Sequence, residues 1–189
     1  MTFILTNPKK QNLQFCQSYD IASESLTLGI TTNAPCIGYT ISPPSNLLVK
    51  TEVKRQRADG KLMSKFLNIK YADLPPKKQI NYLIQEYIPY TVTPFFQKGI
   101  ITFELNKNGN IHSHLICQHE DIKDAWDLKT VRSQILNTVK VKKILKQRSH
   151  LHHVLNHIHY LKDVPDWITY MSKDTDLLKD KNIRLIKFC

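Results

Sequence analysis

Two apolar runs flank a short polar segment near the middle of the chain. Residues 99–105 and 111–117 are rich in β-branched and aromatic residues, and Asn-Lys-Asn-Gly-Asn lies between them at 106–110. This pattern predicts a β-hairpin. Shorter β-prone runs at 38–42 and 157–161 predict two more strands, the first ending at Pro43-Pro44, because proline cannot donate to a strand ladder.

Apolar residues spaced three and four apart predict helices elsewhere. One is expected over 73–88, with its start at Asp73 and its end before Pro89. A second, lysine-rich helix is expected from Asp121 to about Lys146, with a break near Val141, and a short third helix at 165–173.

The remaining segments are less regular. Residues 1–36 mix apolar runs such as 26–30 with turn residues, which suggests an N-terminal arm or additional strands. Residues 50–65 carry six basic side chains around Gly60 and predict a basic loop or hairpin. That segment is either a phosphate-contacting insertion or a solvated surface, and its composition favours neither. Residues 177–189 are expected to form a C-terminal tail, one that can lead into a helicase domain.

Composition narrows the class of protein. The 189 residues include 27 Lys and Arg against 16 Asp and Glu, a formal charge of +11, and 41% are hydrophobic. One globular domain with a polyanionic partner is therefore expected, although a basic surface without any partner gives the same charge. No P-loop motif, signal peptide or membrane-length apolar run occurs, and the four scattered cysteines suit a reducing interior. We expect an intracellular protein that binds no membrane.

His112 and His114 stand two apart on a predicted strand, so their imidazoles point to the same face. Such a pair alone means little, because H-x-H also occurs at 150/152 and 157/159. Glu104, on the other strand of the hairpin, adds a carboxylate. Two imidazoles and one carboxylate with open positions form a common site for a catalytic divalent ion.

The register of the hairpin decides whether these groups meet. A two-residue turn at Asn108-Gly109 would turn Glu104 to the wrong face, because one residue of slip reverses every side chain. A three-residue loop at 107–109, with Gly109 left-handed, puts Glu104 opposite His112 and Thr102 opposite His114. We predict the second register.

Tyr170 and Lys173 are three residues apart on the predicted helix at 165–173 and therefore share a face. An ammonium there can lie near a phenol or near the phosphate that the phenol attacks. Taken alone, this pair is more often part of an ordinary surface.

The order of a β-strand containing Tyr39-Thr40-Ile41-Ser42, then Glu104, His112-Ser113-His114 and finally Tyr170-x-x-Lys173 resembles the replication-initiator (Rep) endonucleases of circular single-stranded DNA viruses, within the HUH superfamily. The resemblance spans about 37–176 and implies an α+β fold: a central antiparallel sheet of about five strands, of the RRM or ferredoxin-like type, flanked by helices. An insertion near 45–72 is implied as well. Ser113 replaces the family's usual apolar residue. The first motif is matched loosely by residues 39–42, and residues 3–6 are a second candidate for it.

The resemblance also implies a function. Glu104, His112 and His114 would hold Mg²⁺ or Mn²⁺, Tyr170 would be the nucleophile and Lys173 its positioning or activating partner. The protein would nick and join single-stranded DNA at an origin stem-loop through a 5′-phosphotyrosine and so start rolling-circle replication, in the nucleus of an infected cell and with a helicase domain or protein as partner. DNA binding is expected from the following residues: Tyr39, Lys50, Lys54, Arg55, Arg57, Lys61 and Trp167.

Three rival interpretations stay open on the sequence. A single-tyrosine transposase or plasmid relaxase shares the histidine pair and the tyrosine. A non-catalytic nucleic-acid-binding module would have structural histidines. A different metal site could form from His153 and His157 with His150 or His152, although no carboxylate or cysteine joins them at suitable spacing.

Overall fold

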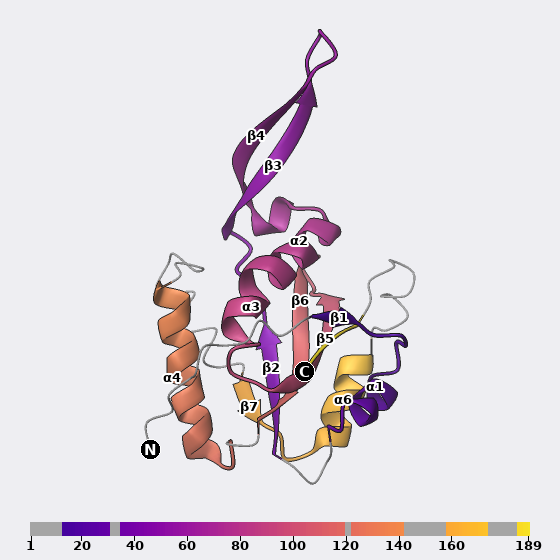
Figure 1. The fold of residues 1–189 in the computed structure, drawn as a ribbon, viewed down its shortest axis with the longest axis vertical. Helices are drawn as coiled ribbons and strands as arrows, with labels where there is room; N and C mark the ends of the chain where they lie inside the picture. Colours follow the sequence, from indigo (N-terminus) through magenta and orange to yellow (C-terminus); the bar gives the residue numbers. More distant parts are fainter. Residues whose placement is uncertain (1–12, 31–34, 120–121, 142–157, 174–184) are drawn as a thin grey trace.

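The computed structural model describes residues 13–30, 35–119, 122–141, 158–173 and 185–189. Its main feature is an antiparallel six-stranded sheet, which confirms the predicted α+β class with one strand more than expected (Figure 1). In spatial order its strands are β1 (Gln14–Phe15), β8 (Ile186–Phe188), β5 (Lys98–Leu105), β6 (Ile111–Gln118), β2 (Cys36–Ile41) and β7 (Ile158–Tyr160).

The β5–β6 hairpin has the predicted three-residue register. Glu104 pairs with His112 and Thr102 with His114. Gly109 has a φ of 76°, in the left-handed region, where a side chain would be strained. The Asn106 carboxamide oxygen accepts hydrogen bonds from the Asn108 and Asn110 amides and so fixes the loop.

Helices cover both faces of the sheet. On the face that carries His112 and His114 lie α1 (Ile21–Thr27) and α6 (Val164–Ser172). The other face packs against α2 (Pro76–Tyr82), a π-helical turn at Leu83–Tyr87, α3 (Ile88–Thr91) and α4 (Ala125–Val141). Among the helices of the described ranges, none has the combined length and apolarity that crossing a membrane requires.

Two local predictions are wrong. Residues 26–30, expected to be extended, include the end of α1, because the Asp20 carboxylate caps that helix by accepting hydrogen bonds from the Ala22 and Ser23 amides. The helical segment predicted to end before Pro89 continues to Thr91. The π-helical turn precedes Pro89, which then sits in the first turn of α3, where its missing N–H is no loss.

The basic segment 50–65 belongs to a hairpin, one of the two forms predicted. β3 (Leu48–Gln56) and β4 (Leu62–Lys70) form a separate two-stranded sheet that projects from the body (Figure 1). Its two ends are tied to the site hairpin. Tyr71, in the short 3₁₀ helix Tyr71–Asp73 after β4, donates its hydroxyl to the Ile111 carbonyl at 2.7 Å, and the Asn110 carboxamide donates to the Ser45 hydroxyl at 2.9 Å.

The predicted C-terminal tail is wrong for its last residues. β8 lies between β1 and β5 inside the sheet, and its Ile186 and Phe188 side chains are buried. Apolar alternation over only three residues explains why this strand was not predicted. Lys187, on the other face of β8, reaches the buried Glu24 of α1, with Nζ 2.9 Å from Oε2.

The Glu24 carboxylate ties α1 to the preceding loop as well as to β8. Its Oε1 accepts hydrogen bonds from the Gln17 and Ser18 amides. Burial disfavours the ionised carboxylate, but the hydrogen bonds from Lys187 and from the two amides outweigh this effect and lower the pKa of Glu24.

We predict that Glu24→Gln lowers the free energy of unfolding by about 2 kcal/mol at neutral pH, because an amide donor then faces the Lys187 ammonium. A lowered folded-state pKa stabilises the fold above the ordinary glutamate pKa, and this stabilisation is lost as the pH falls. The difference between parent and variant should therefore shrink below about pH 4 in urea denaturation followed by circular dichroism. Glu52→Gln, on the exposed hairpin, should change stability by less than about 0.5 kcal/mol at both pH values.

Candidate metal centre and nucleophile

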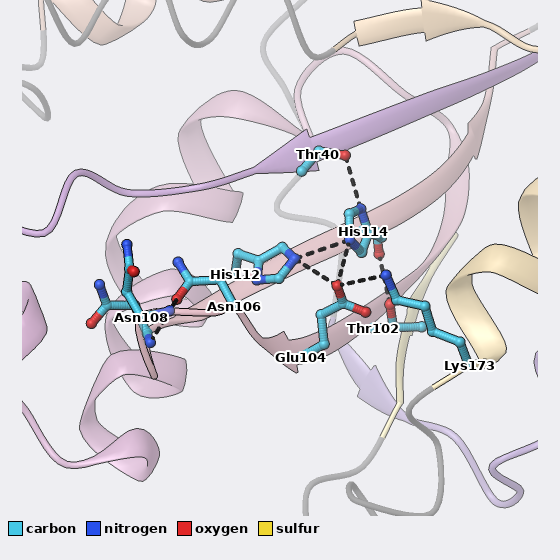
Figure 2. A network of polar contacts seen from close by, with 9 residues as sticks. Thr40, Thr102, Glu104, Asn106, Asn108, His112, His114 and Lys173 are labelled. Atoms are coloured by element: carbon cyan, nitrogen blue, oxygen red, sulfur yellow. Dashed lines mark hydrogen bonds and ion pairs between the residues drawn. The ribbon is translucent and has the colours of Figure 1, made fainter.

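Glu104, His112 and His114 converge at the centre of the sheet (Figure 2). Glu104 Oε1 lies 2.7 Å from His112 Nε2 and 3.1 Å from His114 Nε2, and the two Nε2 atoms are 3.1 Å apart. All three side chains are buried. The hairpin register that was predicted from Gly109 thus produces a compact triangle of one oxygen and two nitrogens.

Neighbouring groups set the charge of the cluster. Burial disfavours the ionised form of Glu104, yet hydrogen bonds with the two imidazoles outweigh it and hold the pKa of this carboxyl well below its usual value. Burial lowers the pKa of His114, so its imidazole is neutral near pH 7 and able to act as a ligand. The cluster therefore combines a carboxylate with an imidazole in its ligand form.

The triangle fits a divalent ion. Ligand atoms at right angles around Mg²⁺ or Mn²⁺, each about 2.1 Å from the ion, lie about 3 Å apart, which matches the observed separations. His112 Nδ1 is buried without a hydrogen-bond partner, so within the fold this ring interacts through Nε2. One carboxylate and two imidazoles suit several divalent metals, and the cluster does not select one among them.

His114 is oriented from the neighbouring strand β2. Thr40 Oγ1 lies 2.8 Å from His114 Nδ1, which leaves Nε2 turned toward Glu104. Such a partner on the second nitrogen fixes the ring of a ligating histidine. Sequence reasoning placed Thr40 in the first motif without a role, since the register of β2 against β6 could not be read from either strand alone.

Helix α6 brings the predicted nucleophile to the cluster. The Tyr170 ring packs edge-on against His114, with centroids 4.9 Å apart, and stacks on Trp167 at 5.4 Å. Trp167 Nε1 donates to the Leu115 carbonyl at 3.0 Å, which fastens the helix to β6. Tyr170 is 42% exposed, so a substrate can reach it.

Lys173 lies between Tyr170 and the Glu104-His112-His114 cluster. Its Nζ lies 3.2 Å from Glu104 Oε1 and 4.0 Å from the centroid of the Tyr170 ring. Burial is the largest single effect and disfavours the ammonium, but the hydrogen bond and charge of Glu104, together with Tyr170, outweigh it and raise the pKa of Lys173. The side chain is half exposed and cationic at neutral pH.

The structure thus brings together Glu104, His112, His114, Tyr170 and Lys173. Trp167 is beside them, stacked on Tyr170. The other predicted DNA contacts lie elsewhere: Lys50, Lys54, Arg55, Arg57 and Lys61 are exposed on the projecting hairpin. The rival histidine cluster at 150–157 falls outside the described residues.

The structure contradicts the predicted DNA contact of Tyr39. Tyr39 is fully buried against the helices on the opposite face of the sheet, so the prediction that it stacks on bases is wrong. Alternation along β2 explains the error, because Gly38 and Thr40 occupy the site face and Tyr39 the other.

We predict that His114→Ala weakens Mn²⁺ binding about 100-fold or more, because one of three ligands is removed. Isothermal titration calorimetry of the apo protein measures this directly. His159→Ala, at an exposed position of β7, is the matched control and should bind Mn²⁺ like the parent. Equal affinity in both variants would show that the cluster is not the metal site.

Comparison with family models, with curated proteins and with solved structures gave no significant match to this chain. The assignment of a function therefore depends on the site itself.

Proposed function

We propose that this protein is a metal-dependent endonuclease that nicks and rejoins single-stranded DNA through a covalent link to Tyr170. One observation carries the proposal: a solvent-accessible tyrosine lies directly against His114 of a buried three-residue cluster suited to a divalent ion. Such a pairing places a nucleophile beside the group that would bind the phosphate.

The reaction is a transesterification. The Tyr170 oxygen attacks the phosphorus and the bond from phosphorus to the 3′ oxygen breaks. The proton that the phenol gives up to solvent is balanced by the proton that the 3′ oxygen takes from solvent as it leaves as a 3′-hydroxyl. A 5′-phosphotyrosine remains. Because one phosphate ester replaces another, a 3′-hydroxyl can later attack the link and restore the strand, so nicking and joining use the same groups.

Glu104, His112 and His114 would hold the metal. When bound, such an ion draws charge from a non-bridging phosphate oxygen and orients the phosphate for in-line attack. The sheet keeps the three ligands in place, with His114 held from behind by Thr40. Mg²⁺ and Mn²⁺ both accept this combination of oxygen and nitrogen ligands.

Lys173 supports the nucleophile as a cation. Its ammonium is held between Glu104 and the Tyr170 ring, where a positive charge stabilises a developing phenolate and attracts the phosphate. Because its pKa is raised, Lys173 stays protonated near neutrality and serves as a source of charge rather than as a base. The raised pKa supports positioning and charge stabilisation as the role of Lys173.

Single-stranded DNA at an origin stem-loop is the substrate that we propose, and initiation of rolling-circle replication is the resulting role. The net charge of +11 favours a polyanion, and Trp167 beside Tyr170 offers an aromatic face for a base. Replication of viral DNA would place the protein in the nucleus of an infected cell, with a helicase domain or protein as its partner.

We predict that Tyr170→Phe abolishes formation of the covalent adduct with labelled single-stranded DNA in the presence of Mn²⁺, because no oxygen remains to attack the phosphate. A denaturing gel detects the adduct. Tyr90→Phe is the control, since Tyr90 is similarly exposed at 36% and lies outside the cluster. An adduct that survives in Tyr170→Phe would exclude this mechanism, and a parent protein that binds DNA without any adduct would favour the non-catalytic module.

We predict opposite effects of Lys173→Met on catalysis and on metal affinity. Adduct formation in single turnover should slow about 10-fold or more, because the charge beside Tyr170 is lost. Mn²⁺ should bind about threefold tighter, because a cation that competes for the Glu104 carboxylate is removed. Lys173→Arg should keep most of the rate. A purely structural role would lower the rate and the Mn²⁺ affinity together.

A further inference from the structure

The β3–β4 hairpin concentrates positive charge away from the metal cluster. Its segment 48–70 has seven basic and two acidic residues, a net charge of +5 out of the chain's +11. In Figure 1 its two strands project side by side from the body. Nearly half of the net charge that first suggested a polyanionic partner is therefore on this one arm.

The fold does not need the outer part of this arm. Residues 54–66 are all exposed, and the apolar residues that pack inward, Val49 and Ile69, are at its base. At about 3.3 Å per residue the outer strands extend about 20 Å beyond that base. An isolated two-stranded sheet is marginally stable in water, so an arm of this length indicates a surface kept for contact with a partner.

The basic residues occupy both faces of the ribbon. The pairing of Lys54 with Ser64 and of Arg55 with Met63 places consecutive residues on opposite faces. Lys50 and Lys54 therefore share one face, and Arg55, Arg57 and Lys65 share the other. A ribbon with cations on both faces suits a groove whose two walls carry phosphates.

We propose that the β3–β4 hairpin enters a groove of duplex DNA and binds the phosphates of both groove walls through its basic side chains. The major groove, about 12 Å wide, admits a two-stranded ribbon. A single strand would instead be held along one face by a series of aromatic rings. The outer hairpin has one aromatic residue, Phe66, which is exposed and has Lys50 Nζ 4.8 Å from its ring centroid, so no series of rings is present. Duplex DNA therefore fits the arm better than a single strand.

The base of the arm adjoins the metal cluster. Tyr71 and Ser45, at the two ends of the hairpin, bond to Ile111 and Asn110, the two residues that precede His112. A duplex held by the arm would therefore continue toward the site where a single strand is cut. On the proposed function, this identifies the substrate as a junction of single and double strands, with the arm on the double-stranded side.

Fluorescence anisotropy tests the proposal by measuring the affinity of the protein for a duplex of about 20 base pairs and for a single strand of the same sequence. EDTA is present so that metal-dependent cleavage plays no part. The fourfold variant Lys54→Ala/Arg55→Ala/Arg57→Ala/Lys61→Ala should bind the duplex about 100-fold more weakly near physiological salt. Its slope of log affinity against log salt should fall by about three, because fewer counterions are released. Single-strand binding should fall less than duplex binding.

A second fourfold variant controls for net charge. Lys77→Ala/Lys78→Ala/Lys123→Ala/Lys162→Ala removes the same charge from exposed positions of the body and should change the salt slope by less than about one. Equal losses in both fourfold variants, or an equal loss for duplex and single strand, would overturn the assignment. A third outcome would also overturn it. If the protein self-associates with rising concentration, Phe66→Ser abolishes this association, and the arm variant Lys54→Ala/Arg55→Ala/Arg57→Ala/Lys61→Ala binds duplex like the parent, the arm is a contact between copies of the chain.

A variant with a shortened arm tests whether a loss of duplex binding comes from the arm itself or from misfolding of the protein. Replacing residues 54–64 with Asn-Gly joins Val53 to Lys65, which are already paired, through a two-residue turn. This variant should keep Mn²⁺ binding at the central cluster and lose the duplex preference. If the parent binds duplex DNA but forms no adduct, the proposed nuclease function is refuted and the proposal that the hairpin binds duplex DNA stands. If the parent forms the adduct but the arm variants bind duplex DNA like the parent, the proposal for the hairpin is refuted and the nuclease function stands.

Discussion

The turn between β5 and β6 is the constraint on which the site depends. A three-residue loop with Gly109 in the left-handed region places Glu104 opposite His112, and strand alternation then adds His114 on the same face. With one residue fewer, Glu104 would point toward the opposite helices and the two histidines would lack a carboxylate. The geometry of the cluster therefore depends on a left-handed backbone conformation that glycine adopts without strain.

The ligand cluster could be predicted from the sequence because all of its parts lie within one hairpin. Glu104, His112 and the loop glycine are close in the chain, so local rules of turn length and alternation sufficed. The approach of α6 could not be derived in this way. It depends on Gly38 of β2, where a Cβ would lie 2.7 Å from Leu161 and 3.0 Å from the Trp167 ring. Such long-range contacts leave no local pattern, and Tyr170 could be linked to the histidines only through a family resemblance.

The errors have related physical causes. Tyr39 was predicted to bind DNA because an aromatic ring can stack on bases. Both faces of this sheet are covered by helices, however, so a central strand is buried on each side. The apolar run at 26–30 could not be read as the end of a helix without the capping Asp20. Pro89 was taken as a stop, whereas a π-helical turn lets the helix restart around it.

The place of β8 in the sheet has a consequence for how the protein forms. β5, which carries Glu104, gains its second neighbour only from residues 186–188, more than 80 positions later in the chain. During synthesis the β5–β6 hairpin can form early, but one edge of β5 stays unpaired until residues 186–188 emerge. An unpaired edge can join strands of other chains. Completing the sheet around the centre is thus a late, long-range event, and slow folding is expected to compete with aggregation at this edge.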